Sequence, residues 1–164
     1  MNPARGGWVI LLSVFAAMVL SVLHLPEDWP QWLGWARPNW MLLVLFFWVM
    51  EVPHRIGLIA AWVIGLLMDA LLGEPLGLNG LLLASVTFVT WRFFERLRMY
   101  ALAQQCATVF ALVLGAELVR YLVLTLGSER ALEWQLVGIA LASMVIWPFI
   151  FVLLMRIKTA VRVE

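Results

Sequence analysis

Charged side chains are scarce in this chain: Asp, Glu, Lys and Arg together make up 13% of its 164 residues. A soluble domain carries about a quarter of charged residues, because it needs polar surface to stay dissolved. Here hydrophobic residues make up 65% of the chain and the mean hydropathy is +0.98. The composition therefore excludes an ordinary soluble domain and indicates a protein that is covered by lipid.

Side chains that could perform chemistry are equally few. The single cysteine, Cys106, lies in an apolar run, so no disulfide can form within the chain, and a small buried side chain is expected there. The two histidines, His24 and His54, are expected at opposite membrane faces, where they cannot act together. We find no serine–histidine arrangement, metal-ligand spacing or phosphate-binding glycine loop. The sequence therefore predicts no enzyme, no catalytic residue, no metal or cofactor, and no nucleic-acid partner.

Six apolar runs divide the chain. A bilayer core of about 30 Å needs about 20 helical residues per crossing, so the length allows several crossings and little else. We predict one integral membrane domain over residues 1–164, an all-α bundle of six transmembrane helices. The first run resembles a signal peptide, but no small-residue cleavage site follows it, so a retained helix is expected. The predicted helices cover about residues 8–25, 38–53, 56–72, 76–91, 99–126 and 134–155.

The positive charges indicate the orientation. With the N-terminus inside, eight of the eleven Lys and Arg residues fall on the inner side. Only Arg37 and Arg130 fall outside, and Arg120 lies within the fifth run. Cytoplasmic loops carry such an excess of positive charge, so both termini of this multi-pass membrane protein are predicted in the cytoplasm. This places residues 92–98 in a cytoplasmic loop and residues 27–37 along the outer surface.

Small residues recur at every fourth place in the third run, where they let another helix approach closely. The following segment, GEPLGLNG, predicts a tight outer turn in which Gly73 caps the third helix and Gly77 takes a positive φ. The second run, MLLVLFFWVM, has no small residue. It is expected at the periphery, facing either lipid or the single helix of a partner. The spaced positions of the third run are Gly57, Ala61, Gly65, Asp69, Gly73 and Gly77.

Three ionisable residues fall inside apolar runs, where a charge is costly and needs a reason. They are Asp69, Glu117 and Arg120, all in the outer halves of their helices. Glu117 and Arg120 are three residues apart and share a helix face. We predict a buried network in which Arg120 is shared by both carboxylates; the alternative is that Arg120 reaches out to the lipid headgroups.

The order and spacing of several motifs resemble the bacterial rod shape-determining MreD family. The similarity covers most of the chain and is strongest in the segment RPNW…EVPHRIG…GLLMDALLGEPLG. It implies a cytoplasmic-membrane protein of the cell-elongation machinery without catalytic activity. It also implies MreC, which has one membrane helix, as a partner, with MreB, RodA and a penicillin-binding transpeptidase acting alongside. The fold implied is that of the substrate-binding subunits of energy-coupling-factor vitamin transporters.

Residues and resemblance together lead to one functional hypothesis and one rival. The hypothesis is a membrane scaffold of peptidoglycan synthesis that docks the membrane helix of MreC and so regulates cell shape. The rival is a substrate-binding subunit of a small-molecule transporter. It would need a pocket near the outer face, built from Asp69, Asn79, Glu117, Arg120 and His24. For the scaffold, the residues expected to bind the partner or hold the docking shape are Gly65, Asp69, Gly73, Gly77, Glu117 and Arg120.

Overall fold

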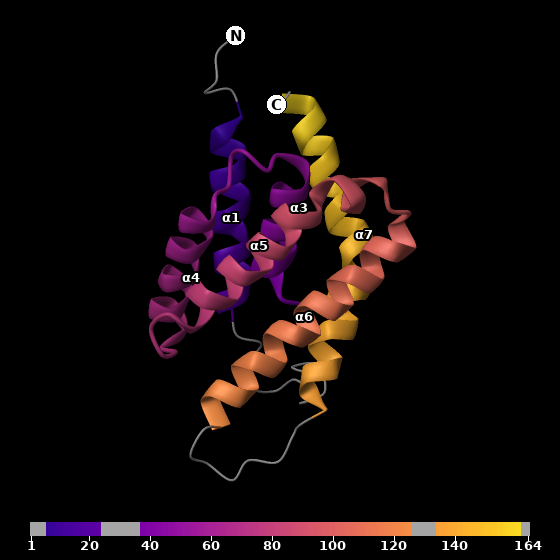
Figure 1. Cartoon of the computed structure of the whole chain (residues 1–164). Helices are drawn as coiled ribbons and strands as arrows, with labels where there is room; N and C mark the ends of the chain where they lie inside the picture. Colours follow the sequence, from indigo (N-terminus) through magenta and orange to yellow (C-terminus); the bar gives the residue numbers. More distant parts are fainter. Residues whose placement is uncertain (1–5, 24–36, 126–133, 162–164) are drawn as a thin grey trace.

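The computed structural model describes residues 6–23, 37–125 and 134–161 (Figure 1). Within these ranges the chain is helical and contains no strand, so the predicted all-α class is confirmed. His24 and the expected outer-surface segment, apart from Arg37, lie outside the described residues. The helices are α1 (Gly7–Val22), α3 (Trp40–Glu51), α4 (Leu58–Leu72), α5 (Leu78–Met99), α6 (Leu102–Thr125) and α7 (Gln135–Val161).

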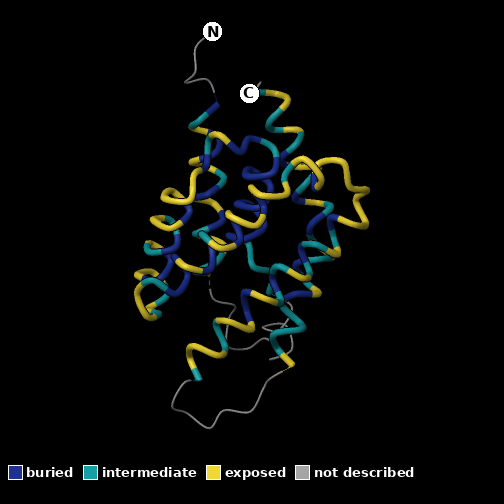
Figure 2. Tube along the Cα trace, viewed as in Figure 1, coloured by how far each residue is buried: buried dark blue, intermediate teal, exposed yellow. Residues whose placement is uncertain are grey.

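The helix α3 is the centre of the bundle. Every residue from Met41 to Met50 is buried, and α1, α5 and α7 pack around the helix (Figure 2). The expected peripheral position of this segment is therefore wrong. A helix enclosed on all sides has no polar face, and large side chains are needed to fill the space to the density of a protein interior. The lack of small residues reflects this filling and not exposure to lipid.

Polar contacts hold both ends of α3. At its start Asn39 caps the helix, with Oδ1 accepting a hydrogen bond from the Leu42 N–H at 3.2 Å. At its end the Glu51 carboxylate accepts from Lys158 Nζ of α7 at 2.5 Å and lies 3.9 Å from Arg98 Nη2 of α5. The central helix is thus tied to two neighbours at the end where both chain termini lie (Figure 1).

The α4–α5 hairpin contains a very close approach of two helices. A Cβ placed on Gly65 would lie 2.4 Å from the Cα of Gly80, so the backbones of α4 and α5 touch there. The turn between them has Gly73 at φ +68° and Gly77 at φ +99°, which confirms the predicted left-handed glycines. The four-residue spacing in α4 therefore serves contact within the hairpin.

The helix α5 extends further than expected. Residues 92–98, predicted as a loop, are helical, and α5 ends only at Met99. The segment WRFFERLRM offers no glycine or proline to stop a helix. Arg96 and Arg98 in the last turn also interact favourably with the negative end of the helix dipole.

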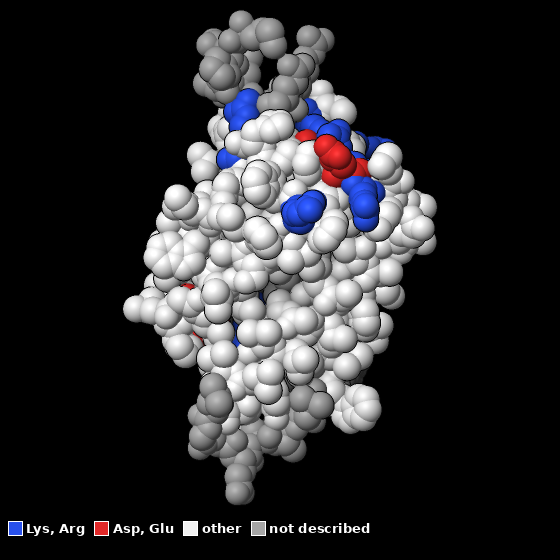
Figure 3. All heavy atoms as spheres, viewed as in Figure 1, with Lys and Arg blue, Asp and Glu red and all other residues white. Residues whose placement is uncertain are grey.

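The outside of the bundle is apolar. Side chains such as Leu11, Ile59 and Phe149 are exposed to 72%, 79% and 70%. On the face shown in Figure 3, Lys and Arg gather near the two termini, and the body of that face is largely free of charge. Among the described helices, α6 and α7 are long and apolar enough to cross a membrane, whereas α1, α3 and α4 are apolar but shorter. These features are those of a membrane protein, and six crossings stays a prediction.

Candidate functional site

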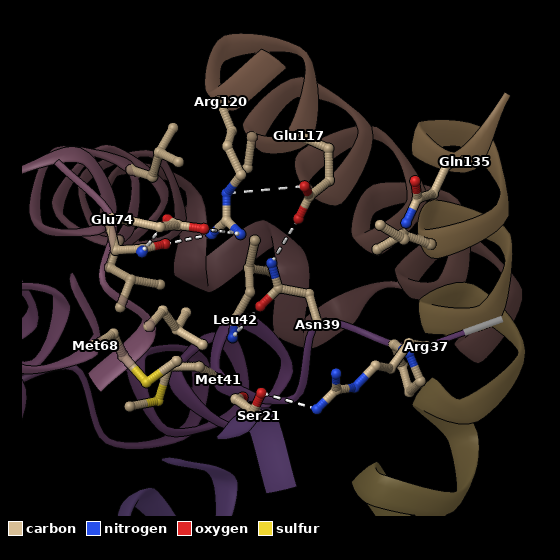
Figure 4. Close-up of a pocket in the computed structure, with 17 residues that line it drawn as sticks. Ser21, Arg37, Asn39, Met41, Leu42, Met68, Glu74, Glu117, Arg120 and Gln135 are labelled. Carbon is tan, nitrogen blue, oxygen red and sulfur yellow. Dashed lines mark hydrogen bonds and ion pairs between the residues drawn. The ribbon is translucent and has the colours of Figure 1, made fainter. Parts of the chain in front are cut away.

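A cavity of about 390 Å³ opens at the end of the bundle far from the termini, which we call the distal end (Figure 4). The α4–α5 turn, the second half of α6, and the starts of α3 and α7 meet there. Its apolar lining includes Met41, Leu42, Met68, Leu72, Leu82, Leu83, Ala116 and Ile139. Its polar lining includes Ser21, Arg37, Asn39, Glu74, Asn79, Glu117, Arg120 and Gln135.

Arg120 is the centre of the polar wall. Its Nη1 lies 3.3 Å from Glu74 Oε1, and its Nη2 donates to Asn79 Oδ1. The Asn79 amide in turn donates from Nδ2 to Glu74 Oε2 at 2.8 Å. The third nitrogen, Nε, lies 3.9 Å from Glu117 Oε2. The expected proximity of Glu117 and Arg120 is thus confirmed, and Arg120 joins α6 to the α4–α5 turn.

Glu117 connects α6 to the start of the central helix. Its side chain is only 6% exposed, and its Oε1 accepts a hydrogen bond from Asn39 Nδ2 at 3.0 Å. The backbone N–H of Asn39 donates to Ser143 Oγ of α7, also at 3.0 Å. Sequence reasoning did not select Asn39, although an asparagine directly before an apolar run is a recognisable helix cap.

Asp69 is fully buried and does not contact Arg120. Its Oδ2 accepts from the Gly77 N–H and its Oδ1 from the Asn79 N–H, both at 2.8 Å. The prediction that Arg120 is shared by Asp69 and Glu117 is therefore wrong for Asp69. Glu74 takes that place, because the turn carries it past the end of α4 to face α6. Asn79 is the link, since its backbone binds Asp69 and its side chain binds Arg120.

The six selected residues all belong to the hairpin or to the face of α6 that meets it. Glu117 and Arg120 line the cavity, whereas Gly65, Asp69, Gly73 and Gly77 do not and act on the hairpin itself. Sequence reasoning placed Glu74 in an outer loop and so missed its pairing. The only available signal was a carboxylate in a turn.

A double-mutant cycle tests the Glu74–Arg120 pair. We expect Glu74→Ala and Arg120→Ala to show a coupling of about 1 kcal/mol in unfolding free energy, modest because both side chains are about one-fifth exposed to solvent or headgroups. The measurement is equilibrium unfolding of the purified variants in detergent. As the control, Arg120→Ala combined with Glu51→Ala at the other end of the bundle should be additive. Additivity in both cycles would show that the pair contributes nothing.

Comparisons with known proteins agree with one another. The family model described as rod shape-determining protein MreD matches residues 4–157, which include the hairpin and the cavity. A rod shape-determining protein MreD from Haemophilus influenzae is 30% identical over 157 residues, covering 96% of this chain and 95% of that protein. No solved structure matches the chain. MreD proteins are membrane proteins with a role in cell shape and are not a known enzyme family. The chain described here belongs to the family of rod shape-determining MreD proteins.

Proposed function

We propose that this chain is a non-catalytic membrane scaffold of the cell-elongation machinery that docks the membrane helix of MreC. The observation that most supports this proposal is the set of hydrogen bonds that the Asp69 carboxylate accepts. A carboxylate buried in an apolar helix is a functional candidate by default. Here both of its oxygens bind backbone N–H groups of its own hairpin, which is a structural task. The buried Asp69 carboxylate thus holds the shape of the hairpin.

The proposed arrangement in the membrane follows the charges. The apolar exterior suits lipid, and the Lys and Arg residues near the termini suit a cytoplasmic face (Figure 3). We propose six crossings with both termini in the cytoplasm, which places the distal end at the outer face. MreB, RodA and a penicillin-binding transpeptidase would then be reached through the complex that MreC forms.

For the docking face we propose the outward side of α6. Helices associate in lipid through small residues that let backbones approach, because the hydrophobic effect does not act between them there. The small-residue face of α4 is already used against α5. The corresponding stripe on α6 is exposed, and a Cβ on Gly115 would meet nothing within 4 Å. The stripe consists of Ala103, Ala107, Ala111 and Gly115.

Co-purification with MreC tests this proposal. We expect Ala107→Leu and Ala111→Leu to lower the amount of MreC recovered with the protein at least tenfold, because a bulky side chain holds the partner helix away. The matched control is Ala60→Leu, the same change at an exposed alanine of α4, which should leave recovery unchanged. Full recovery of MreC with both α6 variants would exclude the stripe, and no recovery with the unchanged protein would exclude MreC binding.

The cavity favours one second candidate, a substrate-binding subunit of a vitamin-type transporter with the fold of energy-coupling-factor subunits. The rival pocket was expected to use Asn79, Glu117 and Arg120, and all three line the cavity. Asp69 is turned away into the hairpin. Tight retention of a vitamin-like ligand by the purified protein, together with normal cell shape after its removal, would favour this candidate over the scaffold.

A further inference from the structure

One buried nitrogen beside the cavity, Arg120 Nε, lacks a hydrogen bond within the described part of the chain. The nearest carboxylate oxygen, Glu117 Oε2, is 3.9 Å away, which is too long for a hydrogen bond. The hydrogen bond of Glu117 is made through its other oxygen, to Asn39 (Figure 4).

This gap is unusual because the other polar groups that contact Arg120 are paired. Glu74 and Asn79 satisfy each other and both terminal nitrogens of Arg120. Leaving a buried donor unsatisfied costs free energy, and such a group in a native structure calls for an unseen partner. A molecule that fits between Nε and Oε2 would remove that cost.

The chemistry of the two atoms restricts the group that can fill the gap. An ammonium could donate to Glu117 but has no lone pair to accept from Arg120. A phosphate or carboxylate oxygen could accept from Arg120 but would be repelled by Glu117. A hydroxyl accepts and donates at the same oxygen, so it satisfies both atoms.

The rest of the cavity indicates what carries this hydroxyl. The cavity is far larger than the roughly 30 Å³ that one water takes up in the liquid. Arg37 lines it as well, and its Nη2 donates to main-chain carbonyls at the end of α1, including that of Ser21 at 2.9 Å. These partners are neutral, and no carboxylate of the described residues is paired with Arg37.

We propose that the distal cavity binds a phosphoglycerol group, with a glycerol hydroxyl between Glu117 and Arg120 and the phosphate toward Arg37. The apolar lining from α3, α4 and α5 suits the carbon chain of an amphiphile. This chemistry is available from the headgroup of phosphatidylglycerol or from free glycerol phosphate. The site is independent of MreC docking, which uses the opposite, outward side of α6.

The test compares two lipids of equal charge. The full chain, purified in detergent, is exposed to phosphatidylglycerol and phosphatidylethanol with identical acyl chains, and bound lipid is counted by native mass spectrometry. The two lipids carry the same phosphodiester charge, and the ethanol headgroup lacks both hydroxyls and one carbon of the glycerol headgroup. We expect about tenfold preference for phosphatidylglycerol, which corresponds to one hydrogen-bonded group between charged partners. Equal retention of both lipids would overturn the proposal.

Two variants test whether Glu117 causes the preference for phosphatidylglycerol. Glu117→Gln removes the carboxylate while keeping an oxygen for Asn39, and the preference should disappear. The matched control is Glu95→Gln, the same change at an exposed carboxylate near the C-terminal end of α5. This variant should keep the preference for phosphatidylglycerol. Thermal unfolding of both variants checks that they fold. A preference that survives in Glu117→Gln would contradict the assignment.

A competition arm separates the two sources of the ligand. Displacement of bound phosphatidylglycerol by millimolar glycerol 3-phosphate would support the proposal with a soluble ligand. Retention of the lipid under the same conditions would support it with the membrane headgroup as the ligand.

Discussion

Replacing Gly65 with alanine is expected to lower the free energy of unfolding by about 3 kcal/mol or more, at the upper end of overpacking costs. The added Cβ would lie 2.4 Å from both the Cα and the N of Gly80, and 2.5 Å from the carbonyl carbon of Asn79. These are backbone atoms, which cannot rotate away as a side chain can. The α4–α5 hairpin would have to open, and Asp69 would lose its geometry with it. Equilibrium unfolding in detergent measures the change.

The matched control is another helical glycine. A Cβ at Gly115 of α6 would meet nothing within 4 Å, so Gly115→Ala should be neutral or stabilising by about 0.5–1 kcal/mol through helix propensity. Similar stability of the two variants would contradict the close approach of α4 and α5. The comparison removes the effect of propensity, which is the same at both positions.

Replacing Asp69 with alanine is expected to cost about 3 kcal/mol or more as well, because hydrogen bonds to charged groups contribute about 1.5–3 kcal/mol each. The change leaves the N–H groups of Gly77 and Asn79 without their acceptor inside a fully buried site. It also releases Asn79, which holds the terminal nitrogen of Arg120. We expect a strong loss of folded protein, measured by unfolding and by yield from membranes.

A second substitution at Asp69 tests how much of the lost stability depends on the carboxylate oxygens. Asp69→Asn keeps one acceptor but directs an amide donor at a backbone donor. It should therefore lower the free energy of unfolding, but by less than Asp69→Ala does. Glu95→Ala, at an exposed carboxylate, should change stability by at most about 0.5 kcal/mol. Equal effects of Asp69→Ala and Glu95→Ala would refute the role of Asp69 in holding the α4–α5 turn.

The hairpin was predictable because its signals are local. The spacing of small residues, the GEPLGLNG turn and the left-handed glycines all act within about twenty residues. The proximity of Glu117 to Arg120 was predictable for the same reason, since three residues along a helix share a face. In each case the neighbouring sequence contains both partners of the contact.

The remaining features depend on contacts between distant segments. An apolar helix has the same sequence pattern whether protein or lipid surrounds it, so the burial of α3 could not be derived from its hydropathy. Likewise, Asp69 and Glu74 lie five residues apart, and only the path of the turn decides which of them meets Arg120. The role of Asn39 depends on Glu117, which is 78 residues away.

The central helix has polar anchors at its two tips, and between them the Trp48 indole donates a hydrogen bond to Ser13 Oγ of α1 at 2.8 Å. Asn39 holds one tip to α6 and α7, and Glu51 holds the other to α5 and α7. A slide of one turn, about 5.4 Å, would pull one anchor into the apolar interior and strip the other of its partners. Lengthwise displacement of α3 is thereby blocked in both directions. Mechanical coupling between the two ends of the molecule through α3 must therefore use tilting or rotation of this helix.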